Sequence, residues 1–431
     1  MYVPYISVAW VLLAQAIVAI QNRWWQRLRW GTVGIALWLS INQFFISPAY
    51  AFQHPKPTLW PNEAVIDEMI TTTPFLKSNL GMVVNTIQIN PFNLDFYGAI
   101  ANFQVFARQL SFSPHTVEQD SQALDWYLTK TQDQGVYDHI EAGQQQLRET
   151  IEAAVELPIH KTWPLPDGSE LRLHHRQNPP ITVKPLAPIK PPQSKPPQSK
   201  PPQISLAEVN TVSSVFPGQS YPITYRVRGS GAALEPGLLL LSWQSVNNAA
   251  NDLWISDHAI GLGYLNTRKQ ASRAFEVIET LSLHVPADIP TGTYRLQAEY
   301  LNRQTRAHYR LSDSAAQVTV IANAPSPEQN VLQNGTPDLA PDLSFAQSPD
   351  LLSVLHYQLA PKLMAGEIDP LFAEIGRINQ YDPLQDYLVQ AEQAMTYRLS
   401  QSTNHADWLY TLALAQVLQQ RPQVRSQLST P

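Results

Sequence analysis

Two long uncharged stretches lie at the start of the chain. Residues 3–20 and 30–52 contain no charged side chain, and neither stretch shows a polar stripe at helical spacing. At ~1.5 Å of rise per residue, a helix of this length crosses a hydrocarbon layer of ~30 Å. The pattern therefore predicts a transmembrane helical hairpin over residues 1–53.

The charges around these stretches predict their orientation. The connector, residues 21–29, carries three arginines, whereas residues 53–68 carry one lysine and three acids. Arginine in short loops stays on the cytoplasmic side, so we expect an integral membrane protein with the bulk of the chain on the non-cytoplasmic side. The alternative is a cleaved signal peptide ending at Ala49-Tyr50-Ala51, which also leaves the bulk of the chain outside.

Proline-rich segments divide the rest of the chain. There are 36 prolines against 17 glycines, and residues 177–203 contain the pentapeptide PPQSK twice. Such a segment forms a stiff polyproline II spacer or, alternatively, a ligand for a proline-recognition domain. A second linker is expected at residues 323–341. The two linkers predict three exterior pieces, at residues 54–176, 204–322 and 342–431.

The first exterior piece alternates helical and strand-like patterns. We expect helices at 63–71, 94–102 and 137–157, strands at 80–84, 103–110 and 125–131, and a hairpin at 160–176 around the turn PDGS. These elements predict an α/β domain.

The other two pieces have different patterns. Residues 204–322 combine the apolar run LLLLSWQSV with alternating strands, and VPADIPTGTYRLQAEY is similar to the closing strands of immunoglobulin-like sandwiches. Residues 342–431 carry three apolar stripes at helical spacing, which fit tetratricopeptide-type units or a plain helical bundle. The expected fold class is therefore multidomain, with two N-terminal transmembrane helices, an α/β domain, an immunoglobulin-like β-sandwich and a C-terminal α-helical region.

Composition excludes several kinds of chemistry. The net charge of −6 gives no basic surface for nucleic acid, and the absence of cysteine excludes disulfides, thiolate zinc sites and cysteine nucleophiles. The sequence has no phosphate-binding glycine loop, zinc-protease motif or nucleophile elbow. We therefore expect no cofactor and no resident metal.

Asn93, Asp95 and Tyr97 are the candidate glycan-binding residues. Two polar side chains beside an aromatic ring suit hydrogen bonding to sugar hydroxyls, although the same residues could simply cap the helix expected at 94–102.

Three other polar groups invite a site. His174 and His175 are adjacent on a strand, where side chains point to opposite faces, so one metal ion would not bind both. Glu118 and Asp120 fall on nearly opposite sides of a helix, which disfavours acid–base chemistry. Asp252, Trp254, Asp257 and His258 crowd one loop, where calcium binding, carbohydrate binding and ordinary loop polarity all fit.

Several strings in the first piece carry a family resemblance. PFLKSNLGMV, Asn90, Tyr97-Gly98-Ala99, FQVFARQ, DWYLTKTQDQG and HKTWPLPDGSELRLHHR resemble the soluble tail of phospholipid-carrier-dependent glycosyltransferases of the protein-mannosyltransferase superfamily in photosynthetic bacteria. The resemblance implies an enzyme that moves a sugar from a polyprenyl-phosphate carrier to an acceptor at the outer face of a membrane.

One departure from that family limits what the resemblance implies. The family's catalytic aspartate lies in a first outer loop that has no counterpart here, so no catalytic residue is assigned. The expected function is that of a C-terminal, non-cytoplasmic part of such a glycosyltransferase, inactive alone and paired with a catalytic membrane subunit. The alternative is a non-catalytic membrane-anchored scaffold that binds glycans or proteins. The lipid bilayer is an expected partner in both cases.

Overall fold

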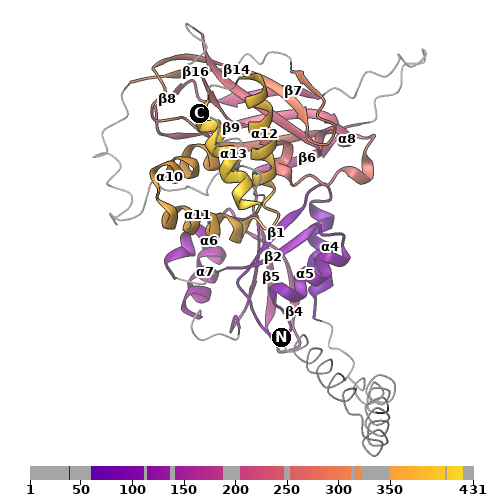
Figure 1. Cartoon of the computed structure of the whole chain (residues 1–431). Helices are drawn as coiled ribbons and strands as arrows, with labels where there is room; N and C mark the ends of the chain where they lie inside the picture. Colours follow the sequence, from indigo (N-terminus) through magenta and orange to yellow (C-terminus); the bar gives the residue numbers. More distant parts are fainter. Residues whose placement is uncertain are drawn as a thin grey trace, which may run out of the picture. The chain divides into compact units, whose positions relative to one another are not determined.

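A computed structural model describes Trp38 and residues 60–110, 114–135, 141–187, 204–246, 253–311, 316–322, 350–402 and 405–420. The chain divides into two compact units, Met1–Trp60 and Pro61–Pro431. The second unit holds all described residues except Trp38 and Trp60, and its architecture is shown in Figure 1.

The expected fold class needs correction in one respect. Among the described residues no helix is both long and apolar enough to cross a membrane. The longest of them, α12 (Asp386–Gln401), has 16 residues and is amphipathic, whereas a membrane span needs ~20 consecutive apolar residues. The described chain is therefore mixed α/β with several sheets, and the two expected transmembrane helices are not supported. Apart from Trp38, the stretches at 3–20 and 30–52 lie outside the described residues.

The first part of the second unit is a five-stranded sheet in the described chain. Its order is β2-β1-β3-β5-β4, in which the first three strands are parallel and the last two form an antiparallel hairpin. The strands are β1 (Ser78–Met82), β2 (Val105–Gln109), β3 (Trp126–Lys130), β4 (Ile159–Pro164) and β5 (Glu170–His175). The expected hairpin is present, and its turn at Gly168 has the positive φ that glycine tolerates.

In the described residues, four α-helices accompany this sheet. They are α4 (Asn62–Thr72), α5 (Pro91–Ile100), α6 (Val117–Gln122) and α7 (Glu141–Ala153). Helices α4 and α5 lie on one side of the sheet and α6 and α7 on the other (Figure 1). Helix α7 lies within the helix predicted at 137–157 and buries Leu147 and Ile151. Residues 137–140 of that predicted helix lie outside the described residues.

The second part is a two-sheet sandwich. One sheet has the order β6-β13-β9-β7 and the other the order β11-β10-β14-β16-β8, with β12 paired to β10 and β15 to β14. The first sheet comprises β6 (Ile181–Pro185), β7 (Ser205–Thr211), β9 (Ser220–Ser230) and β13 (Ala274–His284). The second comprises β8 (Ser214–Val215), β10 (Gly237–Ser245), β11 (Leu253–Ile255), β12 (His258–Ala259), β14 (Gly292–Asn302), β15 (His308–Arg310) and β16 (Gln317–Val320).

Strand β6 lies inside the segment predicted as a linker, residues 177–203. It pairs antiparallel with β13 at the edge of its sheet. Proline is tolerated at the end of an edge strand, where its missing N–H breaks no ladder, so Pro185 does not prevent pairing. Residues 188–203, which contain the PPQSK repeats, and the second expected linker lie outside the described residues.

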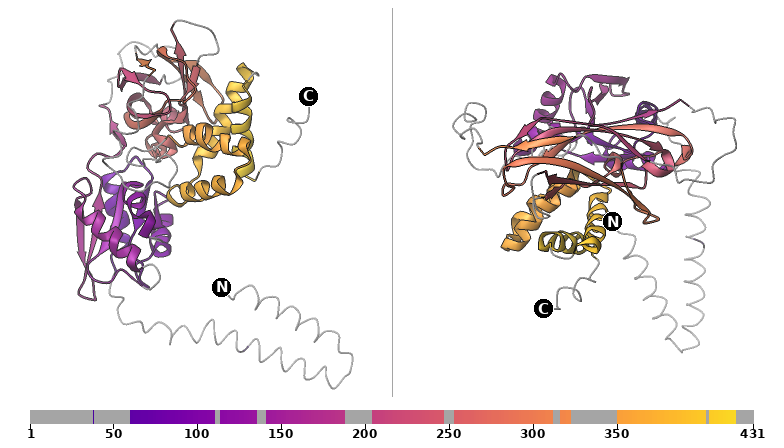
Figure 2. Two further views of the ribbon diagram at one scale, coloured as in Figure 1. Left: turned by 90° about the vertical axis from the view of Figure 1, so that its left-hand side faces the viewer. Right: turned by 90° about the horizontal axis from the view of Figure 1, so that it is seen from above.

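Between residues 350 and 420, the described part of the chain forms five α-helical segments that pack on the sandwich. They are α9 (Leu351–Val354), which continues through a π-helical turn (Leu355–Leu359) into α10 (Ala360–Ala365), then α11 (Ile368–Tyr381), α12, and α13 (Ala406–Leu418). Figure 2 shows them on one face of the sandwich. Their apolar faces share a core with Leu238 and Leu240 of β10, so the helices are not a free-standing array.

This packing explains the four leucines of the run LLLLSWQSV. Leu239 and Leu241 of β10 face the interior of the sandwich, whereas Leu238 and Leu240 face the helices. A strand that is buried on both faces reads as a continuous apolar run rather than as an alternating one.

A buried ion pair joins α12 to the sandwich. The Arg398 guanidinium donates from Nε and Nη2 to the two carboxylate oxygens of Asp257, both at 2.6 Å. The side chains of Arg398 and Asp257 are only 10% and 0% exposed. Asp257 also accepts from the backbone N–H of Leu241 at 2.8 Å, and Arg398 donates to Ser242 at 3.1 Å. The donors and acceptors of both charges are thus largely satisfied within the core.

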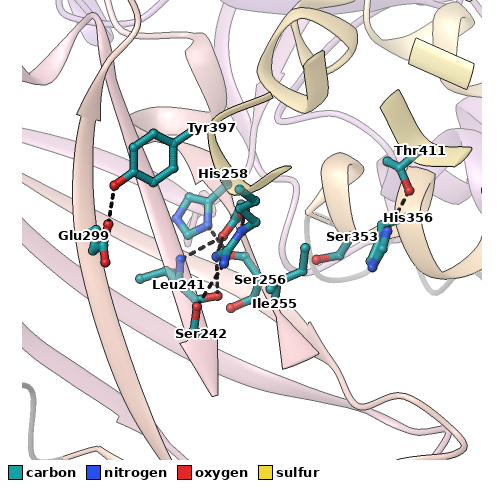
Figure 3. Close-up of polar contacts among 12 residues, drawn as sticks. Leu241, Ser242, Ile255, Ser256, His258, Glu299, Ser353, His356, Tyr397 and Thr411 are labelled. Atoms are coloured by element: carbon teal, nitrogen blue, oxygen red, sulfur yellow. Dashed lines mark hydrogen bonds and ion pairs between the residues drawn. The ribbon is translucent and has the colours of Figure 1, made fainter. Parts of the chain in front are cut away.

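Further polar contacts surround this pair (Figure 3). The Tyr397 hydroxyl donates to Glu299 at 2.8 Å, and the His356 ring meets the Thr411 hydroxyl at 2.7 Å. Beside them, His258 contacts Glu279 at 3.2 Å with both side chains buried. Burial alone would lower the pKa of His258, but the hydrogen bond and charge of Glu279 outweigh burial and raise it to about 9.

We predict that Arg398→Met lowers the free energy of unfolding by about 3–5 kcal/mol, because it leaves Asp257 charged and unpaired in the core. Urea unfolding would measure this. Adding Asp257→Asn should recover part of the loss, since the amide still accepts from Leu241 and carries no charge. Arg268→Met is the matched control, because Arg268 pairs with Glu235 at the surface. A loss as large in the control as in Arg398→Met would contradict the importance of the buried pair.

Candidate ligand-binding site

The predicted glycan-binding residues hold α5 in place. Asn93 donates through its side chain to the carbonyl of Gln88 at 2.9 Å, and Asp95 accepts from the backbone N–H of Ala107 at 2.7 Å. Burial raises the pKa of Asp95, although the Ala107 hydrogen bond opposes the shift. Tyr97 packs edge-on against the Phe96 ring. Two of the three side chains therefore have backbone partners, and the three do not surround a described cavity.

The two adjacent histidines separate as strand geometry requires. His174 is buried and contacts the Thr129 hydroxyl at 2.9 Å and the carbonyl of Leu157 at 3.1 Å. His175 faces the other way and stacks on Trp126, with ring centroids 3.7 Å apart and planes at 12°.

The remaining candidates are internal contacts. Asp120 is buried and accepts from the Tyr381 hydroxyl at 2.6 Å, so it forms an internal contact between α6 and α11. Trp254, Asp257 and His258 are also buried rather than displayed on an open loop. Asp252 lies outside the described residues.

A cavity lies where the α/β sheet, the sandwich and the C-terminal helices meet, and we call it the junction cavity. Its volume is about 160 Å³. Its wall is formed by the starts of β1 and β3, the end of β5, the loop at Leu262 and Tyr264, and helices α11 and α12. Figure 1 shows α11 close to both the α/β part and the sandwich.

The cavity lies at the amino ends of the parallel strands. Open α/β sheets usually bind ligands at the carboxyl ends, but side chains occupy that edge here. Gln144 donates to the carbonyl of Val83 at 2.8 Å and Gln109 to that of Met82 at 3.2 Å. At Gly135 a side chain would collide with the carbonyl of Asn85, since the two backbones touch there. In the described chain, the junction cavity is therefore a better candidate ligand-binding site than the carboxyl ends of the strands.

Asn79 at the start of β1 contributes an unpartnered acceptor. Its Nδ2 donates to the Tyr264 hydroxyl and to the carbonyl of Tyr381, both at 3.0 Å. The carbonyl accepts only, so it fixes the orientation of the amide. The opposite atom, Oδ1, is buried and has no hydrogen-bond partner among the described residues.

His175 contributes a second unpartnered atom. Its Nε2 is buried and also lacks a partner in the described part of the chain. Burial, together with electrostatic repulsion from His160 and Arg176, lowers the pKa of His175 to about 4. The imidazole is therefore neutral near pH 7 and offers one donor and one acceptor.

Asp125 adds a carboxyl group to the same wall. Its side chain is 35% exposed and lies 3.5 Å from the guanidinium of Arg176. Desolvation raises its pKa to about 6, although Arg176 opposes the shift. Perturbed acids and bases in a concave site are typical of functional sites.

The opposite wall comes from the sandwich and the helices. The Tyr264 hydroxyl donates to Asp382 at 2.5 Å, and burial raises the pKa of Asp382 despite that hydrogen bond. Tyr387 and Gln390 of α12 complete this wall together with several apolar side chains: Ile181, Leu262, Leu351 and Ile378. Most of the cavity surface is thus apolar, with a few polar groups that converge on it.

No protein-family model and no curated protein matches the chain. The glycosyltransferase resemblance therefore stays a prediction.

Sequence reasoning missed Asn79 and the position of His175 beside the junction cavity. Each is a single polar residue at the end of a short strand, which is an ordinary position for a polar side chain. No signal in the sequence separates them from other strand ends.

We predict that the Asp125 carboxyl titrates near pH 6 in a carbon-detected NMR titration. Asp167 is the comparison, because hydrogen bonds from Ser169 lower its pKa to about 2, and it should titrate far below Asp125. An unfolded Asp has a pKa of ~3.9, so the folded chain binds the Asp125 proton more tightly. The contribution of Asp125 to the free energy of unfolding therefore falls as pH rises from about 4 to 6. Asp125→Asn should remove that fall. A midpoint near 4 would contradict the assignment.

Proposed function

We propose that the described part of the chain is a non-catalytic recognition module whose junction cavity binds one hydroxyl-bearing ring, such as the terminal sugar of a glycan. The observation that carries the proposal is that Asn79 and His175 line the same cavity and that each has one buried atom, Oδ1 and Nε2, without a hydrogen-bond partner among the described residues.

The chemistry of this pair favours a hydroxylated ligand. A buried polar atom without a partner costs about 1–3 kcal/mol, which a ligand recovers by hydrogen bonding to it. Asn79 Oδ1 only accepts, while Nε2 of the neutral His175 ring either donates or accepts, according to the tautomer. A sugar hydroxyl does both. Asp125 supplies a third, partly solvated acceptor on the same wall.

The size of the cavity limits the ligand to about one ring. A cavity of ~150 Å³ in another protein accommodates benzene, and the junction cavity measures about 160 Å³. The apolar part of the wall, with Tyr264 and Tyr387, suits the C–H face of a six-membered ring. A longer glycan would have to leave the rest of its residues outside.

The glycosyltransferase resemblance supports a place for this module in glycan assembly. In that proposal a catalytic membrane subunit supplies the site for the polyprenyl-phosphate sugar, and the module described here holds the donor sugar or the end of the acceptor. The described residues then position a substrate, and none of them carries out the transfer.

The test is a titration of the full chain with a panel of methyl glycosides, in which ligand-observed NMR and calorimetry measure binding. His175→Phe keeps a ring stacked on Trp126 but removes Nε2, so it should weaken binding of the preferred glycoside about tenfold, as for the loss of one hydrogen bond with its partner left buried.

His405→Phe is the matched control. The His405 ring stacks on Trp408, with ring centroids 3.8 Å apart and planes at 17°, and His405 does not line the cavity. It should bind as the unaltered chain does. Equal affinity of the unaltered chain and His175→Phe, or no binding to any glycoside, would refute the proposal.

A further inference from the structure

Five large apolar side chains on and beside α5 are exposed, and we call them the α5 patch. Their exposed fractions lie between 60% and 84%, and they are Ile87, Phe92, Phe96, Ile100 and Phe103. Phe92, Phe96 and Ile100 follow one another at four-residue spacing, so they project from one side of the helix. Isolated exposed apolar residues are ordinary, but a contiguous group marks an interaction surface.

The other side of α5 already has a partner. Leu94 and Gly98 are buried, and a Cβ on Gly98 would lie 2.2 Å from the carbonyl oxygen of Val105 in β2. The helix thus lies directly against the sheet through this side. The α5 patch is not needed to hold α5 in the described fold.

The backbone after α5 keeps Phe103 exposed. Asn102 and Phe103 both have positive φ, at 62° and 56°. Asparagine tolerates this region, whereas a bulky residue there is strained by about 1–3 kcal/mol. The backbone N–H of Phe103 donates to the carbonyl of Gly98 at 2.8 Å, which holds this turn in place. The Phe103 side chain is 60% exposed, so it gains little from packing within the described chain.

The patch is also almost free of charge. Residues 86–103 contain one charged residue, Asp95, and its carboxylate is engaged by the N–H of Ala107 at 2.7 Å. A partner that recognises charge therefore finds little to bind here. The polar groups between the apolar side chains are mostly amides, such as Asn93 and Gln88.

The chain that leads into this region is apolar as well. The uncharged stretch at 30–52 ends eight residues before Trp60, a reach of at most ~30 Å. Helix α4 begins two residues later and contacts α5. Along the sequence, an uncharged stretch therefore precedes α4 and α5 closely.

We infer that the α5 patch binds a lipid surface, with its phenylalanines in the boundary between headgroups and acyl chains. Hydrocarbon accepts protruding apolar side chains of any shape, whereas a protein partner must provide matching pockets.

The absence of cysteine allows a direct test. Phe96→Cys in the full chain carries one environment-sensitive fluorophore, and the chain is added to vesicles of phosphatidylcholine and phosphatidylglycerol. The label should shift to the blue and lose at least about half its intensity when the vesicles contain spin-labelled lipid, since an interfacial helix face sinks ~5–10 Å into the bilayer. The same label at Phe372→Cys, on the exposed face of α11, should not respond.

A second measurement separates the patch from residues 1–60. The fragment Pro61–Pro431 contains its own hydrophobic cores and is a compact unit, so it can be floated with the same vesicles. Phe92→Ser with Phe96→Ser should reduce bound protein at least tenfold, because two exposed phenylalanines no longer enter lipid. Met364→Ser with Phe372→Ser, two residues that are each 55% exposed, is the matched control.

Circular dichroism would show that both double variants are folded. An unquenched label at position 96, a fragment that does not float, or equal flotation of the two double variants would overturn the inference. A dimer of the fragment that the Phe92 and Phe96 changes dissociate would instead identify the patch as a contact between copies.

Discussion

The ion pair between Arg398 and Asp257 is the contact on which the arrangement of the second unit depends. It lies in the core between α12 and β10 and is almost inaccessible to water. A charge buried at such depth is tolerated only with a close opposite charge and hydrogen bonds to its remaining atoms. The pair therefore permits one position of α12 on the sandwich. Since Gln390 and Tyr387 lie on the same helix, this position also sets one wall of the junction cavity.

A second set of contacts connects that wall to the α/β part. Tyr381 at the end of α11 donates to Asp120 and its carbonyl accepts from Asn79, while Asp382 accepts from Tyr264 of the sandwich. The α/β part, the sandwich and the C-terminal helices thus meet at Tyr381 and Asp382, the last residue of α11 and its cap. The cavity is the space these contacts leave. Its shape depends on the packing of the three parts, which is typical of small-molecule sites between domains.

The sequence predicted the elements far better than their contacts. Local patterns indicated the α4 helix, the hairpin of β4 and β5 and the alternating β14, because capping, turn chemistry and periodicity act over a few residues. The partner of Asp257 lies 141 residues away, and no local pattern encodes it. The same limit hid β6 within a proline-rich segment and the unpartnered atoms of Asn79 and His175. The two uncharged N-terminal stretches met a length criterion for membrane helices that no described helix meets.

The most direct test of the account is a crystal structure of the full chain soaked with the glycoside that binds best. The account predicts density for one six-membered ring in the junction cavity, with a hydroxyl within hydrogen-bond distance of Asn79 Oδ1 and another near His175 Nε2. A ring bound elsewhere at saturating concentration, with only ordered water at these two atoms, would contradict it.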